Sequence, residues 1–236
     1  MDSQKDIKCD DGVCITPDIE EMDNNIETED SQGKLIYFGD PMCSWCWGIT
    51  NHLEQLKNEF DGKLEFGMVM GGLRPGGGEL WNSEMKAFLR EHWEHVEQAS
   101  GQPFNYGLLD WDEFDYDTEP PARAVRVIRD IKPDQELEFY KSVQYAFYVL
   151  NHDPGKKEFY QPLCEQIGVS FDTFIALFNS DGYKKLVRQD FVYAQQLGVR
   201  GFPSVVLQQR DKLTAISRGY ATFEAMKTRV EELLTD

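Results

Sequence analysis

Residues 35–46 read LIYFGDPMCSWC, a short apolar run joined by a turn to a pair of cysteines. The run at 35–38 has the length and aromatic content of a buried strand, and the Gly-Asp-Pro that follows it ends the strand. Apolar residues then recur at helical spacing as far as Phe60. We therefore expect a strand, a turn and then a helix that begins at Cys43.

The rest of the chain divides into a second strand, a long helical stretch and a final pair of strands. Strand character continues at 63–70 and returns only at 203–209 and 212–217, before an amphipathic helix at 222–234. Helical patterns fill the interval, with helices expected at 79–99, 120–131, 134–150, 156–167, 171–179 and 182–197. The order is β-α-β, a helical insertion, then β-β-α, which predicts an α/β fold.

Residues 1–33 differ in composition from everything after them. They hold eleven acidic residues against two lysines and show no hydrophobic period, so we expect a disordered acidic tail. The compact part then comprises 34–74 and 198–236, interrupted by a helical insertion domain at 75–197. We expect this insertion to be all-helical over about 110 residues.

The charge balance limits the classes of partner. The formal net charge is -18, and long-range repulsion from phosphates argues against nucleic acid and against anionic membrane surfaces. The N-terminus lacks the basic and apolar regions of a secretory signal, and no stretch is apolar enough for a membrane helix. We therefore expect a cytoplasmic protein, in which a close cysteine pair indicates redox chemistry or metal binding.

The pair Cys43-Ser44-Trp45-Cys46 lies where the strand and turn give way to a helix N-terminus. Unpaired N–H groups and the helix dipole stabilise a thiolate at this position, and two intervening residues bring both sulfurs together on one turn. Cys43, nearer the helix start and expected to be the more exposed, is the candidate nucleophile. Cys46 is the candidate resolving thiol for a mixed disulfide.

Other interpretations of this pair remain open. A structural zinc site uses the same spacing but needs a second pair of ligands, which Cys9 and Cys14 could in principle supply. An inert pair is the third interpretation. His92 and His95 are also compatible with metal by spacing, yet a solvated helix face explains them better, so we expect no metal site and no cofactor beyond the redox-active disulfide.

A second signature, GVRGFP at 198–203, leads directly into a strand. Proline has no N–H for a sheet ladder, so Pro203 suits an X–Pro bond held cis, although an ordinary proline at a strand entry is the simpler alternative. Beside the dithiol, Pro203 would shield the sulfurs from metal. It would also leave the backbone of Phe202 free to pair with an extended substrate segment.

These two motifs together resemble the DsbA-like branch of the thioredoxin superfamily, over roughly residues 34–234. Within that branch DPMCSWCWG at 40–48 and YDTEPPARAV at 116–125 look like the FrnE-like predicted protein-disulfide isomerases. The resemblance implies a thioredoxin fold with an all-helical insertion. It also implies that Cys43 is the nucleophile, Cys46 the resolving thiol and Pro203 the cis-proline.

The chain departs from its relatives in the groups that tune the thiol. Ser44 and Trp45 supply no cation between the cysteines, and Tyr37 stands where many thioredoxin-fold proteins carry a buried acid. Asp40 is the nearest acid, and its charge opposes a low thiol pKa. Because the helix dipole still acts, we expect a modestly lowered pKa for Cys43, nearer the value of about 7 in thioredoxin than the value of about 3.5 in DsbA.

The remaining candidates are aromatic residues and cysteines. Trp45 and Trp47 could join Phe202 in an apolar substrate-docking surface. Cys9 and Cys14 could form a shuttle disulfide that reaches the dithiol through a flexible tether, or could be two incidental thiols. The acidic loop at 108–119 is expected to be solvated, with calcium as the alternative, and the glycines at 76–78 to form a hinge.

The pattern as a whole predicts a thiol–disulfide oxidoreductase, a reductase or isomerase acting on protein or low-molecular-weight thiol and disulfide substrates. The main alternative is an adaptor of the same fold, which docks a partner and does not need its thiols. Kappa-class glutathione transferases and related isomerases share the fold, but they carry a serine where Cys43 stands, which argues against them. The sequence does not predict an oligomeric state.

Overall fold

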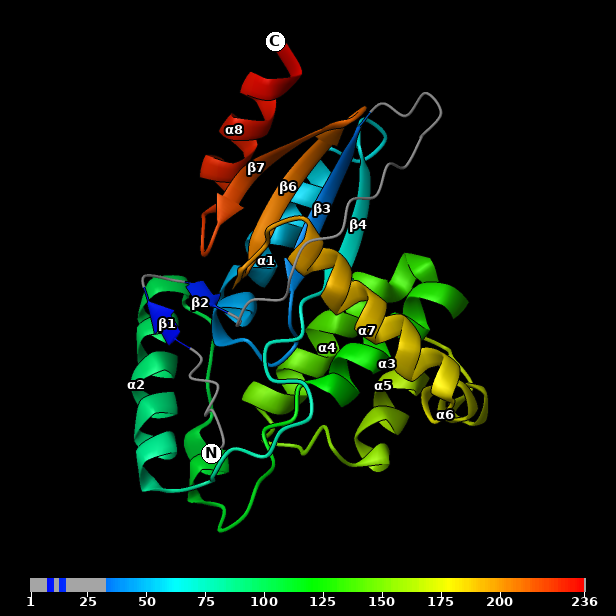
Figure 1. The fold of residues 1–236 in the computed structure, drawn as a ribbon. Coiled ribbons are helices and arrows are strands. Elements are labelled where there is room, and N and C mark those ends of the chain that lie inside the picture. The colour runs from blue at the N-terminus through cyan, green and yellow to red at the C-terminus, as the bar shows by residue number, and fades with distance from the viewer. Residues whose placement is uncertain (1–7, 11–12, 16–32, 236) are drawn as a thin grey trace.

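The structure, a computed structural model, describes residues 8–10, 13–15 and 33–235. Its larger sheet has the strand order β4-β3-β6-β7 (Figure 1), formed by Lys34–Gly39 (β3), Glu65–Met70 (β4), Ser204–Gln209 (β6) and Lys212–Arg218 (β7). β3 pairs parallel with β4 and antiparallel with β6, and β6 pairs antiparallel with β7. The expected thioredoxin fold is confirmed.

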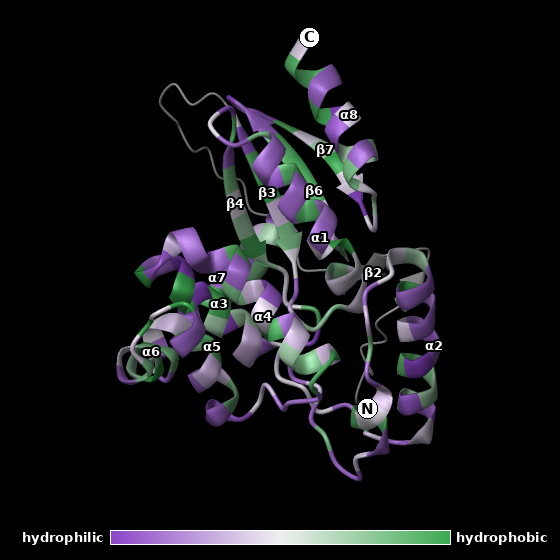
Figure 2. Cartoon of the chain, turned by 180° about the vertical axis from the view of Figure 1, so that it is seen from behind, coloured by the Kyte–Doolittle hydropathy of each residue, from purple (hydrophilic) through white to green (hydrophobic). Residues whose placement is uncertain are grey.

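Helices cover both faces of this sheet. Ser44–Glu59 (α1) and Phe223–Thr235 (α8) contact each other on one face, and Asp181–Gln196 (α7) packs on β4 from the other (Figures 1 and 2). The central strand β3 is buried along almost its whole length, since it has neighbours on both edges and helices on both faces. This is why residues 35–38 are uniformly apolar instead of alternating.

The insertion holds the remaining helices: Ser83–Ser100 (α2), Glu119–Ile131 (α3), Glu136–Tyr148 (α4), Tyr160–Gln166 (α5) and Phe171–Phe178 (α6). Local signals set several of their ends. The side chain of Asn82 caps α2, that of Ser170 caps α6, and two prolines occupy the first turn of α3. Because Asn82 supplies the cap, α2 begins four residues later than the expected start at 79.

The helices of the insertion are divided between two apolar clusters. Helices α3 to α7 bury their apolar faces against the same cluster as the sheet, which runs from Leu35 through Val125 and Phe174 to Leu207. A second cluster lies under α2 and is built from Trp93, the loop that follows and the end of α4. Met42 and Trp47, on either side of the cysteine pair, belong to this second cluster, so the dithiol lies where the two cores meet.

The first described residues correct one expectation. The segments Lys8–Asp10 (β1) and Val13–Ile15 (β2) form an antiparallel hairpin, and β2 pairs with the short strand Gly201–Phe202 (β5). Figure 1 places this hairpin beside α2 and the lower end of the sheet. Six residues of the expected disordered tail are therefore ordered by backbone pairing, which a search for hydrophobic periodicity does not detect. The rest of that expectation lies outside the described residues.

Candidate active site

The turn after β3 delivers both cysteines to the start of α1. Cys43 is the N-cap residue, with its N–H donating to the carbonyl of Asp40 at 3.1 Å, and its own carbonyl accepts from Trp47. Cys46 lies within the first turn, and its sulfur accepts from the Asp40 N–H at 3.5 Å. Both sulfurs are thiols in the structure and lie at the helix end that favours negative charge.

Phe202 and Pro203 meet this turn from the other half of the chain. The peptide bond between them is cis, which confirms the expectation for Pro203. The thiol of Cys43 donates to the carbonyl oxygen of Phe202 at 3.6 Å, across 159 residues of sequence. The ring of Phe202 lies over Gly71, where any Cβ would overlap it. The two motifs thus form one site, because β3 and β6 are adjacent antiparallel strands, and the end of β3 lies beside the start of β6.

The burial of Cys43 corrects two further expectations. Neither sulfur-bearing residue is exposed, since Cys43 and Cys46 both have a relative exposure of 0%. Burial raises the pKa of the Cys43 thiol well above its ordinary value, and the neighbouring Cys46 and Asp40 add to the rise. We expected a modestly lowered pKa from the helix dipole, but loss of solvent outweighs that dipole here.

Asp40 is a buried carboxylic acid in the turn itself. Its side chain accepts from the N–H groups of Met42 at 2.9 Å and Leu73 at 2.8 Å, so it fixes the turn and the exit from β4 together. Burial raises the pKa of Asp40 to about 6, although these hydrogen bonds act in the opposite direction. A group that titrates near neutral pH therefore lies next to the dithiol.

Tyr37 and Tyr140 form a polar contact beneath Cys46. Their hydroxyl groups are 3.1 Å apart, and the Tyr140 hydroxyl donates to the carbonyl of Asp40 at 3.1 Å. Burial raises the pKa of Tyr37, and Cys46 adds to that rise, which places the thiol close to a protonated phenol. Tyr37 stands at the position where an acid was missing from the sequence, whereas Tyr140 reaches the site from α4 and was not predicted, because no sequence motif marks it.

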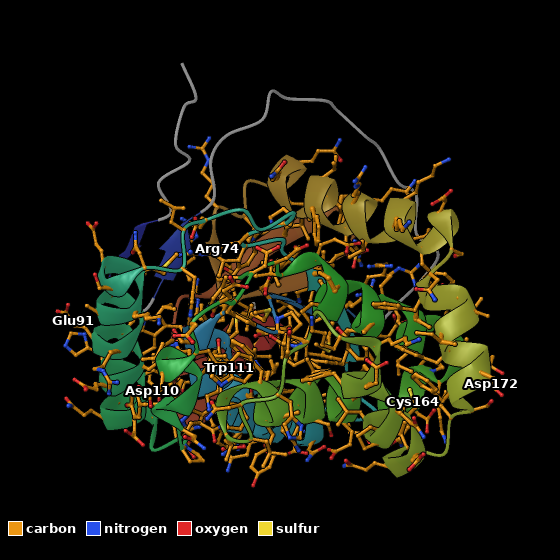
Figure 3. All side chains as sticks on the ribbon, turned by 90° about the horizontal axis from the view of Figure 1, so that it is seen from below. Arg74, Glu91, Asp110, Trp111, Cys164 and Asp172 are labelled. Carbon is orange, nitrogen blue, oxygen red and sulfur yellow. The ribbon has the colours of Figure 1, made fainter. Side chains whose placement is uncertain are left out.

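Arg74 and Tyr116 are a second pair that sequence reasoning did not assign. The Arg74 guanidinium lies 5.3 Å from the Tyr116 ring centroid, and the Tyr116 hydroxyl donates to the carbonyl of Met42 at 2.8 Å. Burial lowers the pKa of Arg74, while Tyr116, Asp40 and Cys43 counteract that change. Arg74 also forms an ion pair with Glu79. Figure 3 shows Arg74 towards the middle of the molecule.

The two tryptophans of the motif have different surroundings. Trp45 is half-buried and packs on Tyr220, with ring centroids 5.7 Å apart. Trp47 is buried, stacks on Tyr148, and donates through Nε1 to the carbonyl of Pro103 at 3.1 Å. Trp45 therefore retains some surface for a substrate, whereas Trp47 supports the insertion beneath the site.

The acidic loop and the glycines bind each other. Asp117 accepts from the Gly76 N–H at 2.8 Å, and Asp115 accepts from the Gly78 N–H at 2.9 Å. The carboxylates that could have suggested calcium thus hold the exit from β4. In the part of the chain that the structure describes, no three His, Cys, Asp or Glu side chains are close enough together to hold a metal.

A pocket of about 320 Å³ adjoins the start of β5. It is lined by residues 197–201 and by residues of β6 and β7, with Arg200 and Arg218 among them. Cys164, the remaining cysteine of 33–235, is buried in α5 and lies far across the insertion from Arg74 (Figure 3). Burial raises the pKa of its thiol to about 12.

Comparisons with known proteins agree with this geometry. Residues 34–230 match the family model of the DSBA-like thioredoxin domain. A candidate protein disulfide isomerase from Nitrosomonas europaea is similar in structure, with a TM-score of 0.80 and 31% identity over 86% of this chain and 98% of that one. The cytosolic disulfide reductase DsbM from Pseudomonas aeruginosa has a TM-score of 0.71 and 22% identity over 86% and 98%, a likeness of fold. No curated protein matches the sequence.

Proposed function

The chain belongs to the DsbA-like thioredoxin family of thiol–disulfide oxidoreductases, and we propose that it reduces and isomerises disulfides through a Cys43 mixed disulfide that Cys46 resolves. The observation that carries this proposal is the contact between the Cys43 thiol and the Phe202 carbonyl at 3.6 Å. It sets the nucleophile beside β5, a short strand whose backbone can pair with an extended substrate in exchange for β2. We propose protein or low-molecular-weight disulfides as substrates and the cytoplasm as the location.

The first step is attack by the Cys43 thiolate on one sulfur of a substrate disulfide. A bond forms between Cys43 and that sulfur, the substrate disulfide breaks, and the second substrate sulfur leaves as a thiolate that takes up a proton. Pairing between the substrate backbone and Phe202 aligns the substrate disulfide with Cys43. The peptide groups at the start of α1 stabilise the attacking charge.

The second step is resolution by Cys46. Its sulfur attacks the Cys43 sulfur, the mixed disulfide breaks, and the substrate leaves with two thiols while Cys43 and Cys46 become a disulfide. The Asp40 N–H donates to the Cys46 sulfur at 3.5 Å, which helps to hold that sulfur in the first turn of α1. A low-molecular-weight thiol then returns the pair to the reduced state.

The surroundings of Cys43 favour reduction over oxidation. A strong oxidant has a low thiol pKa, because a stable thiolate favours the reduced enzyme. Here burial raises the pKa of Cys43, and no cation stands between the two cysteines. DsbM, which shares this fold, is described as a cytosolic disulfide reductase and also has a structure with glutathione.

In the described residues, no helix is long and apolar enough to cross a membrane.

The test is insulin reduction with dithiothreitol or glutathione as electron donor. We expect Cys43→Ser to lower the rate at least 100-fold, because it removes the attacking sulfur. The matched control is Cys164→Ser, which removes a buried thiol remote from the site and should retain the wild-type rate. Equal rates for wild type and Cys43→Ser would reject the enzyme and favour the adaptor of the same fold, which would bind its partner with either residue.

A further inference from the structure

The N-terminal hairpin puts a second pair of cysteines in register with the site. In β1 and β2, Cys9 lies opposite Cys14, and in β2 and β5, Cys14 lies opposite Phe202. Phe202 is the residue whose carbonyl contacts the Cys43 thiol. Three segments that are distant in the sequence thus meet at one position: the hairpin, β5 and the start of α1.

Strand β2 occupies the place that an extended substrate needs. Recognition by strand addition requires a free edge next to the reacting group. Along β5 the edge that carries Phe202 is already paired with β2, through the two residues that lie opposite Gly201 and Phe202. Figure 1 shows the hairpin at the same end of the sheet as the N-terminus of α1. The hairpin therefore holds the position of a substrate strand.

The register also permits a disulfide within the hairpin. Directly opposite residues of an antiparallel pair have Cα atoms about 4.5–5.5 Å apart, and disulfides span Cα separations of about 4.4–6.8 Å. Cys9 and Cys14 are such an opposite pair. Cys14 and Phe202 are another, so Cys14 is one strand spacing from the residue that contacts Cys43.

We propose that the hairpin is a substrate in cis, whose Cys9–Cys14 disulfide exchanges with the Cys43–Cys46 pair. This inference rests on the proposed function and names one substrate of the same site. The Cys43 thiolate attacks the sulfur of Cys14, forming a Cys43–Cys14 bond while the Cys9 sulfur leaves as a thiolate. Cys46 then attacks Cys43 and releases Cys14 as the second thiol, so the hairpin gains the two electrons that the Cys43–Cys46 pair loses.

The direction of the first attack follows from the register. Cys14 is in the strand that pairs with β5, whereas Cys9 is one strand further away. Because a cis substrate stays attached to the chain, its effective concentration is on the order of millimolar, and the exchange proceeds without a collision between molecules. A substrate in trans has to displace β2 before it reaches Cys43, which itself has no exposed surface.

The experiment traps the first intermediate in the full-length chain. Cys46→Ala leaves Cys43 without its resolving thiol and fits the buried site. The variant is oxidised with diamide, its free thiols are alkylated, and it is digested with trypsin without reductant. Cys9 and Cys14 fall in one tryptic peptide, 9–34, while Cys43 falls in 35–57 and Cys164 in 158–184. Tandem mass spectrometry then shows which cysteines are joined.

We expect a disulfide between peptides 9–34 and 35–57 in more than half of the molecules, with Cys14 in the linkage and Cys9 alkylated. The yield stays the same on tenfold dilution, because the exchange is intramolecular. The matched double variant Cys46→Ala/Cys14→Ser lowers this linkage at least tenfold. Cys46→Ser, a second trapping variant, gives the same linkage and guards against a packing defect at position 46.

Other outcomes overturn the inference. These are a linkage through Cys9, a linkage to peptide 158–184 or to a second chain, and the absence of any link to 35–57 in both trapping variants. Insulin reduction by the wild type is measured separately. If the wild type reduces insulin but the linkage is absent, only the cis substrate is rejected, whereas an inactive wild type rejects the proposed function itself.

Discussion

The N-terminal hairpin and the helical insertion both reach the dithiol, but they do so by different means. The hairpin pairs with β5 through backbone groups, in a register of two residues. The insertion reaches the site with buried side chains, among them Tyr140 and Tyr116, which bond to the carbonyls of Asp40 and Met42. Backbone pairing accepts almost any sequence and can be exchanged, whereas a buried hydroxyl network fits one partner. The buried side chains of the insertion thus form a fixed wall of the site. Strand β2 of the hairpin is, in our proposal, the replaceable strand, whose place a substrate takes.

The largest effect should come from the core of the insertion. Trp93 is fully buried in α2, and its ring contacts those of Phe104, Phe147 and Tyr148. We expect Trp93→Ala to lower the free energy of unfolding by about 3–5 kcal/mol, because it removes a large side chain and leaves a cavity. Urea denaturation measures this change. Leu80→Ala, at a position that is 75% exposed, is the control and should change the free energy by less than about 0.5 kcal/mol.

A loss below about 1 kcal/mol for Trp93→Ala would contradict the view of the insertion as a fixed wall. The second cluster would then be loosely packed, and its contacts with Met42 and Trp47 could not hold the turn that carries Cys43.

The pH dependence of stability should report the buried acid in that turn. The pKa of Asp40 rises to about 6 in the folded chain from an ordinary value of 3.8, so the folded state holds this proton more tightly than the unfolded chain. The stabilisation of the folded state by protonated Asp40 is therefore complete below about pH 4 and is lost as the pH rises through about 6. The free energy of unfolding should therefore fall by an amount on the order of 2–3 kcal/mol between pH 4 and 7 on account of Asp40.

Asp40→Asn should remove this loss of stability between pH 4 and 7, as measured by urea denaturation across that range. Asp110→Asn, at an exposed carboxylate, is the control and should keep the wild-type slope. If Asp40→Asn and wild type have parallel profiles, the carboxyl is not protonated near neutral pH, and the turn is solvated in the folded protein.

A smaller effect should come from one hydroxyl of the wall. Tyr140→Phe removes the donor to the Asp40 carbonyl and the partner of the Tyr37 hydroxyl, and leaves buried polar groups unpaired. We expect a loss of about 1–2 kcal/mol in the free energy of unfolding, together with a slower resolution step in stopped-flow insulin reduction. Tyr145→Phe, on the same helix but 47% exposed, is the control. Equal losses in both variants would show that the network under Cys46 carries no special stability.

The smallest effect should come from the hairpin, if it is the replaceable strand. Two short strands add little to cooperative unfolding. We therefore expect Cys9→Ser/Cys14→Ser, under reducing conditions, to change the free energy of unfolding by less than about 0.5 kcal/mol. A loss above about 1.5 kcal/mol would make the hairpin part of the cooperative core, and the contrast with the insertion would no longer hold.

The elements themselves were predictable because their signals are local. Alternation, apolar runs and glycine or proline breaks depend on neighbours a few residues away, and they place β3, α1 and the final hairpin within one or two residues. The proximity of Cys43 and Phe202 was also predicted, because the implied fold makes the strands next to them neighbours in the sheet. Tyr140 and Arg74 were missed, because nothing near them in the sequence marks a tyrosine or an arginine that will pack near the turn of the dithiol.

The sequence by itself determined where the chain turns, where α1 begins and that two thiols lie at that helix end, because backbone preferences act over a few residues. Only the tertiary structure decided the environment of those thiols. The complete burial of Cys43, the raised pKa of Asp40 and the strand of the hairpin on β5 all arise from segments between 30 and 190 residues apart. Solvent exclusion depends on every neighbour in space at once, and a local pattern records none of them.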